Sequence, residues 1–108
     1  MTQLHALVTY VPTDYAEAVL AAIGDAGAGR IGNYSHCSFT LPGTGRFTPL
    51  PGARPFIGVE GAGEQVAEVR IECIVEAELL DPVILALRSA HPYEVPALMS
   101  WAVDGHRT

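Results

Sequence analysis

The order in which strand-like and helix-like segments follow one another constrains this fold most. An apolar run rich in β-branched residues covers 4–11 and stops at Pro12, which predicts a short buried strand. After Pro12, apolar residues recur at helical spacing to about residue 23, with Thr13 as the expected N-cap. Glycines then end this segment. The chain therefore opens with a strand followed by a helix.

Two further strands, a second helix and a last strand are predicted after this helix. Period-two patterns predict strands over 34–41 and 65–75, an apolar stripe predicts a helix over 80–90, and 98–103 supplies a last strand. Residues 42–64, between the two middle strands, are rich in glycine and proline but also carry apolar side chains. We expect an ordered long loop or irregular hairpin there, not a flexible linker.

This order, βαββαβ, is that of a ferredoxin-like sandwich, an α+β fold with an antiparallel sheet and two helices on one face. The 108 residues suffice for a single domain over 1–108. Because two helices cover only one face, the other face is left to water or to another subunit.

Composition and charge exclude several classes of partner. Twelve acidic residues oppose six basic ones, all Arg and none clustered, so nucleic-acid binding is disfavoured. The apolar runs are far shorter than the roughly 20 residues that a membrane helix needs. The N-terminus lacks the features of a secretory signal, so we expect a cytoplasmic protein with no membrane partner.

Strand parity predicts that both cysteines lie beneath the helices. Cys37 alternates in step with Phe39 and Leu41, and Cys73 alternates with charged residues on the 65–75 strand. Cysteine is among the most buried residue types, so the core is the expected place for both. A metal site shared by His36 and Cys37 would require a bulge or a strand end, and whether they share one ion stays open.

The opposite parity collects polar side chains on the open face of the sheet. Histidine and carboxylate are ligand types for a divalent metal. The alternative is that Glu68, Arg70 and Glu72 form a lattice of ion pairs across strands or between subunits, and this is favoured because charged residues are common on a solvated sheet face. The residues expected on this face are His5, Thr9, Tyr34, His36, Ser38, Glu68, Arg70 and Glu72.

A second cluster of candidate residues follows the second helix, in the string HPYEVP over 91–96. Its two prolines stiffen the backbone, so His91 and Glu94 are presented from a rigid turn. Such a turn suits a binding site. It equally suits a helix end at which His91 meets the last carbonyls and Tyr93 fills the core. No nucleophile elbow, phosphate loop or CxxC motif is present, so enzymatic activity is not indicated.

Four strings carry a family resemblance: GAGRIGNYSHCSF (27–39), GTGRFTPLPGARPFIG (43–58), VAEVRIE (66–72) and AHPYEVPA (90–97). In this order they resemble the YqfO-type domain inserted in the Nif-three-like proteins, and HPYEVP also resembles a turn of the CutA divalent-ion-tolerance proteins. The resemblance implies a PII/CutA-like fold and a symmetric homotrimer with its sheets facing inward. The GTP cyclohydrolase label of the full-length relatives belongs to a separate metal-containing body, so we do not expect it to transfer.

Two functional hypotheses follow from the residues and the resemblance. The first is a non-catalytic oligomer that binds copper or zinc for metal homeostasis or tolerance. Its candidate ligands are His36, His91, Glu72, Glu94, Cys37 and Glu68. The second is a small-molecule effector-sensing or protein-interaction module that uses the 42–64 segment and an intersubunit cleft. Its candidate clamp for an anionic or aromatic ligand consists of Arg46, Phe47, Arg54 and Phe56.

Overall fold

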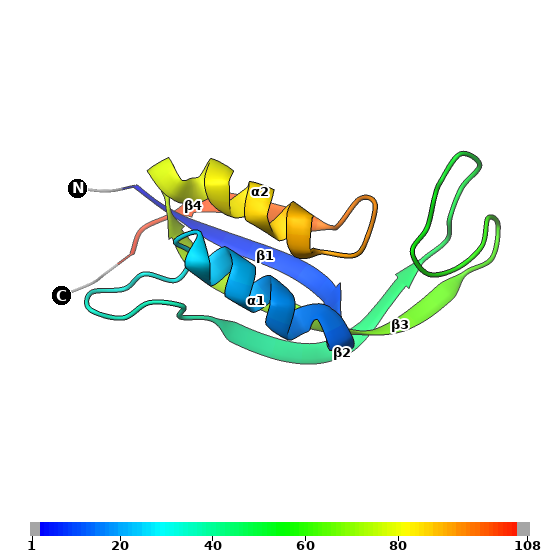
Figure 1. Ribbon diagram of the computed structural model, residues 1–108, viewed down its shortest axis with the longest axis horizontal. Coiled ribbons are helices and arrows are strands. Elements are labelled where there is room, and N and C mark those ends of the chain that lie inside the picture. Colours follow the sequence, from blue (N-terminus) through cyan, green and yellow to red (C-terminus); the bar gives the residue numbers. More distant parts are fainter. Residues whose placement is uncertain (1–2, 106–108) are drawn as a thin grey trace.

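The computed structural model describes residues 3–105 and confirms the ferredoxin-like α+β fold (Figure 1). Four antiparallel strands form one sheet in the order β2-β3-β1-β4, and both helices cover the same face. The elements, with two short 3₁₀ turns η1 and η2, are β1 (Leu4–Pro12), η1 (Thr13–Tyr15), α1 (Ala16–Asp25), β2 (Phe39–Phe47), β3 (Glu64–Glu76), η2 (Ala77–Leu79), α2 (Leu80–Ala90) and β4 (Leu98–Val103).

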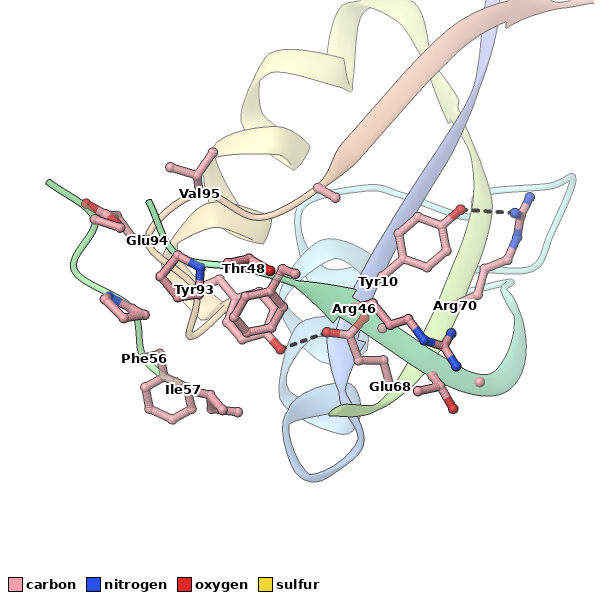
Figure 2. Close-up of a pocket in the computed structure, with 18 of the residues that line it drawn as sticks. Tyr10, Arg46, Thr48, Phe56, Ile57, Glu68, Arg70, Tyr93, Glu94 and Val95 are labelled. Carbon is pink, nitrogen blue, oxygen red and sulfur yellow. Dashed lines mark hydrogen bonds between the residues drawn. The ribbon is translucent and has the colours of Figure 1, made fainter. Parts of the chain in front are cut away.

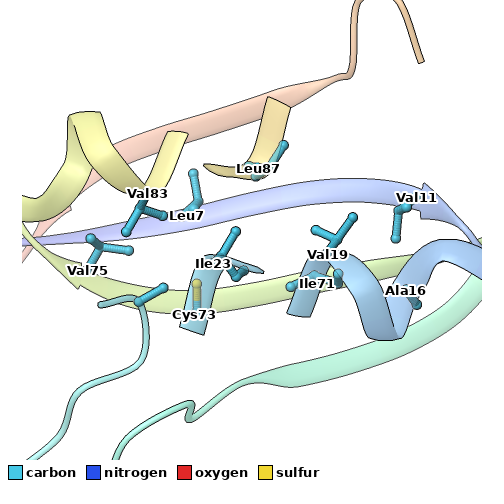
Figure 3. Close-up of a cluster of buried hydrophobic side chains, with 11 residues drawn as sticks. Leu7, Val11, Ala16, Val19, Ile23, Ile71, Cys73, Val75, Val83 and Leu87 are labelled. Carbon is cyan, nitrogen blue, oxygen red and sulfur yellow. The ribbon is translucent and has the colours of Figure 1, made fainter. Parts of the chain in front are cut away.

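The core lies between the helices and the two central strands (Figure 3). Full burial of one aliphatic side chain stabilises a fold by about 1.5–3 kcal/mol, so this cluster is the main source of stability. Cys73 belongs to it, as predicted, and burial raises the pKa of its thiol to about 11. The central members are Leu7 and Val11 from β1, Val19 and Ile23 from α1, Ile71 and Val75 from β3, and Val83 and Leu87 from α2.

Strand β2 starts later than predicted. It begins at Phe39 and ends at Phe47, so the first part of the predicted 42–64 loop is strand. Residues 31–38 form a turn instead, in which Ile31 pairs with Tyr34 and His36 has a φ of 60°. A residue in this left-handed region breaks the alternation of a strand, which is why the predicted strand does not form over 34–38.

The predicted position of Cys37, Phe39 and Leu41 beneath the helices is wrong. Phe39 pairs with Glu72 and Leu41 with Arg70, so both lie on the open face, 57% and 48% exposed. Cys37 lies before the strand and is half-buried. The reason is topological: β2 is an edge strand, and the helices pack over β1 and β3, so its apolar side has no helix to face.

His5 and Thr9 also lie on the face opposite to the one predicted. They pair with Val75 and Ile71, which are core residues on the helix-covered face. Thr9 is fully buried and its hydroxyl donates to the carbonyl oxygen of Ala97 at 2.8 Å. Strand β1 is central and apolar on both faces, so hydropathy could not show which of its alternate residues face the helices.

The pairing of β2 with β3 continues past the end of β1. The last partner of β1 is Glu68, opposite Pro12, whereas the β2–β3 ladder runs on to the pair Phe47–Glu64. Residues 44–47 and 64–67 therefore form a two-stranded arm beyond the helices, with residues 48–63 as its tip loop (Figure 1).

Candidate functional site

A cavity of about 820 Å³ lies between the arm, the tip loop and the turn 91–97 (Figure 2). Small-molecule sites typically have volumes of about 300–1,000 Å³ and combine apolar walls with a few polar groups. Phe47 of the arm, Phe56 of the tip loop and Tyr93 supply aromatic walls, and Glu68 and Glu94 supply carboxylates. The cavity thus has the size and the mixed lining of a ligand site.

His91 holds the turn beside this cavity in place. Its side chain is buried, its Nε2–H donates to the carbonyl oxygen of Tyr10 at 2.7 Å, and its Nδ1 accepts from the Tyr93 N–H at 3.1 Å. This pair of bonds requires a neutral imidazole protonated on Nε2. Burial lowers the pKa of His91, which agrees with the neutral form. With both ring nitrogens engaged, His91 acts as a support for the turn in this arrangement.

Tyr93 and Glu68 form the polar wall of the cavity (Figure 2). The Tyr93 hydroxyl donates to Glu68 Oε2 at 2.7 Å, and its ring meets Phe47 edge to face at 5.7 Å. Burial and the neighbouring Glu68 raise the pKa of Tyr93, so the hydroxyl stays a donor. Of the two alternatives given for this turn, the core position of Tyr93 is wrong, because its ring packs against Phe47 of the arm.

Gly45 makes room for this carboxylate. A Cβ at Gly45 would overlap the Glu68 carboxylate, so only a glycine lets Glu68 lie against the arm. The sequence did carry a signal for this contact, since a glycine within a strand often marks the close approach of another group. We expected residues 42–64 to be a loop, so this contact was not predicted.

Two contacts fold the tip loop back towards the body. The backbone N–H of Arg54 donates to Glu94 Oε2 at 3.0 Å, and Phe56 packs edge to face on Tyr15 at 5.5 Å. Of the four residues predicted to clamp a ligand, Arg46, Phe47 and Phe56 line the cavity, whereas Arg54 contributes its backbone to the loop contact.

Glu72, another predicted ligand, is in an ion pair on the open face. Arg70 Nε lies 3.2 Å from Glu72 Oε2, and Arg70 Nη1 donates to the Tyr10 hydroxyl at 3.3 Å. Both charged side chains are about 40% exposed, 39% for Arg70 and 44% for Glu72, so the pair adds little stability. Arg70 and Glu72 thus form an ion pair within β3, whereas Glu68, the third charge of the expected lattice, bonds to Tyr93 instead.

His36 lies far from the cavity. The segment that carries it and the turn 91–97 are at opposite ends of the sheet (Figure 1). Its Nε2 is 2.9 Å from Asp25 Oδ1 and its Nδ1 is 2.9 Å from Ser35 Oγ. The ring lies against Gly24, where a Cβ would overlap it. His36 thus ties its loop to the end of α1, and Asp25 is a partner that sequence reasoning missed.

The six predicted metal ligands are consequently spread over three places: the loop of His36 and Cys37, the open face, and the cavity with its turn. Within residues 3–105, no three or more His, Cys, Asp or Glu side chains are arranged to hold a metal ion. Over the same residues, no helix has both the length and the apolar character needed to cross a membrane.

Comparison with known proteins finds close relatives of this sequence, although no family model matches it. The chain is 50% identical over 96 residues to the "GTP cyclohydrolase 1 type 2 homolog" of Mycobacterium tuberculosis, covering 89% of this chain and 25% of that protein. The protein of the same name from Bacillus subtilis is 48% identical over 101 residues, covering 94% and 27%. The chain therefore spans about a quarter of the length of these curated relatives.

Comparison with solved structures points to the same group of proteins. A Bacillus cereus protein related to NIF3 superposes with a TM-score of 0.84 at 46% identity, covering 96% of this chain and 26% of that one. CutA from Synechococcus elongatus superposes with a TM-score of 0.67 at 22% identity, covering 95% and 79%, which establishes a common fold. Over its own length, this chain is therefore a homologue of one segment of the NIF3-related proteins, with the PII/CutA-like form of the ferredoxin-like fold.

Proposed function

We propose that this chain is a non-catalytic domain that binds a small-molecule effector in the cavity between the arm, the tip loop and the turn 91–97. The cavity itself carries the proposal: it is large enough for a small molecule and combines aromatic walls with two carboxylates. The contacts of Arg54 with Glu94 and of Phe56 with Tyr15 bring the tip loop to its edge, so ligand binding and loop position are expected to be coupled.

The lining supports binding over covalent catalysis. The described residues that line the cavity include no Ser, Cys, Lys or His. The hydroxyl that pairs with a carboxylate there is that of Tyr93, and its raised pKa disfavours its use as a nucleophile. On this proposal the hydrolase name of the longer relatives does not describe the chemistry of this chain. A cytoplasmic location is part of the proposal.

We further propose that the domain works as a homotrimer formed through the open face of the sheet. That face exposes large apolar side chains: Phe39 at 57%, Leu41 at 48%, Met99 at 46% and Trp101 at 47%. Exposed apolar patches of this kind mark interfaces. Leu41 and Arg70 belong both to this face and to the cavity wall, so a second subunit would border the ligand site.

A thermal-shift screen with nucleotides, metabolites and divalent metals tests the effector proposal. A ligand selective for the folded state raises its stability, by about 2.7 kcal/mol at a concentration one hundred times its Kd. The shift should disappear in Phe47→Ala, which opens the cavity wall, and persist in Val59→Ala, whose exposed side chain lies in the tip loop outside the lining. Equal loss in both variants would contradict binding in this cavity.

Binding of copper or zinc is the second candidate. It is favoured by the solved neighbours from Archaeoglobus fulgidus and Ehrlichia chaffeensis, whose names describe divalent cation or ion tolerance, and by the Asp25–His36 pair, which already brings two ligand types together. Native mass spectrometry with elemental analysis tests it and reports the subunit number. Metal binding that survives His36→Ala and His91→Ala would contradict these ligands.

A further inference from the structure

Glu68 is the one acidic side chain that is buried among the residues that the structure describes, at 8% exposed. Its carboxylate lies in the cavity wall, where Tyr93 donates to one oxygen. In the described part of the chain, no Arg or His nitrogen lies within 4.0 Å of it. Burying a carboxylate costs free energy unless a cation or several hydrogen-bond donors compensate it. Among the described residues, the side-chain donor to Glu68 is the single hydroxyl of Tyr93.

The surroundings of Glu68 suit a cation. Tyr93 and Phe47 stand beside it as an edge-to-face pair, and Tyr10 and Phe56 add further aromatic surface to the lining. Aromatic faces attract cations, and this attraction strengthens where water is excluded. The rest of the lining is largely apolar, with side chains such as Leu41, Leu50, Ile57 and Val95, and would hold a hydrophobic body.

Arg70 lines the cavity as well, and its charge is already paired with Glu72. Arg46 also lines the cavity and would favour an anionic ligand, as expected from the sequence. Its side chain is exposed, so water already solvates its charge. Glu68, by contrast, is buried, oriented by Tyr93 and fitted against Gly45. A charge that is oriented and desolvated discriminates between ligands more strongly than one exposed to water, so the carboxylate decides the ligand class.

Resting on the function proposed above, we propose that the cavity selects small molecules that carry a protonated amine on an apolar or aromatic body. The ammonium group donates to Glu68 while the body packs between Phe47 and the tip loop. Glu94 is held by the backbone of Arg54, so its carboxylate maintains the loop and leaves the recognition of the amine to Glu68.

Three matched probes test this proposal by calorimetric titration of the full chain: 2-phenylethylamine, 2-phenylethanol and phenylacetate, which are cationic, neutral and anionic. The wild type should bind the amine in preference to the other two. Glu68→Gln keeps an acceptor for Tyr93 but removes the charge, and should lower amine affinity at least about tenfold. Glu17→Gln, on the exposed surface of α1 and outside this cavity, is the control and should bind the amine like the wild type.

The outcomes separate this proposal from the proposed function. Preference for phenylacetate, or unchanged amine affinity in Glu68→Gln, overturns the amine class while leaving the cavity as an effector site. If none of the three binds but another molecule from the screen is lost in Phe47→Ala, the amine class is again wrong and the effector function stands. If Glu68→Gln fails to fold, the selectivity of the wild type among the three probes still decides whether the cavity prefers a protonated amine.

Discussion

Replacing Tyr93 with Phe should destabilise the protein through the loss of one hydrogen bond. The substitution removes the hydroxyl that donates to Glu68 Oε2 at 2.7 Å and leaves the ring in place against Phe47 and His91. A hydrogen bond to a charged group contributes about 1.5–3 kcal/mol, and a buried acceptor left without its donor adds a cost of desolvation. Since Glu68 is only 8% exposed, we expect a loss of about 2 kcal/mol in the free energy of unfolding.

Urea denaturation followed by circular dichroism at matched protein concentration measures this loss. Tyr34→Phe is the control, because Tyr34 is 75% exposed, and it should change stability by less than about 0.5 kcal/mol. A Tyr93→Phe variant as stable as this control would refute the reasoning. Combining it with Glu68→Gln should give less than the sum of the two single losses, because Glu68→Gln turns the charge-assisted bond into a weaker neutral one and Tyr93→Phe removes the same bond.

Three further predictions concern the core, the loop of His36 and the turn. Leu7→Ala should cost about 2–5 kcal/mol in denaturation experiments, whereas Leu85→Ala, 68% exposed, should cost far less; equal losses would contradict the assigned core. Gly24→Ala should destabilise the wild type, since its Cβ would overlap the His36 ring, but stabilise a His36→Ala background by about 0.5 kcal/mol; the same sign in both would exclude this contact. Because the folded state lowers the pKa of His91 from its ordinary 6.5, its contribution to stability is present above pH 6.5 and is lost as pH falls further. The stability difference between wild type and His91→Asn should therefore shrink in acid, and a constant difference would argue against a neutral, buried His91.

Much of the fold could be predicted from local patterns. The helix predicted over 80–90 and the strand predicted over 98–103 coincide with α2 and β4. The alternation of β3 correctly separated the buried Ile71 from the charged Arg70, because one side of that strand faces the helices and the other does not. The prediction failed over 34–38, where the backbone at His36 leaves the extended region and no hydropathy pattern reports it.

The candidate site was less predictable, because its members meet only through long-range contacts. Arg54 and Glu94 are 40 residues apart in the sequence, and Tyr93 and Glu68 are 25 apart. Most of the residues of interest were singled out by type, yet their grouping was not. His36 and His91, chosen as ligands of one site, lie in segments at opposite ends of the sheet (Figure 1).

By itself, the amino-acid sequence determined the order of the elements and the buried side of α2 and β3, because hydrophobic periodicity reports whether one side of an element avoids water. The tertiary structure alone decided the face towards which β1 and β2 turn their side chains, since β1 is apolar on both sides and β2 is an uncovered edge. It also decided that the arm, the tip loop and the turn 91–97 enclose one cavity around Glu68. Those contacts depend on sheet order and register. Both are set by packing across the whole molecule and produce no pattern in the local sequence.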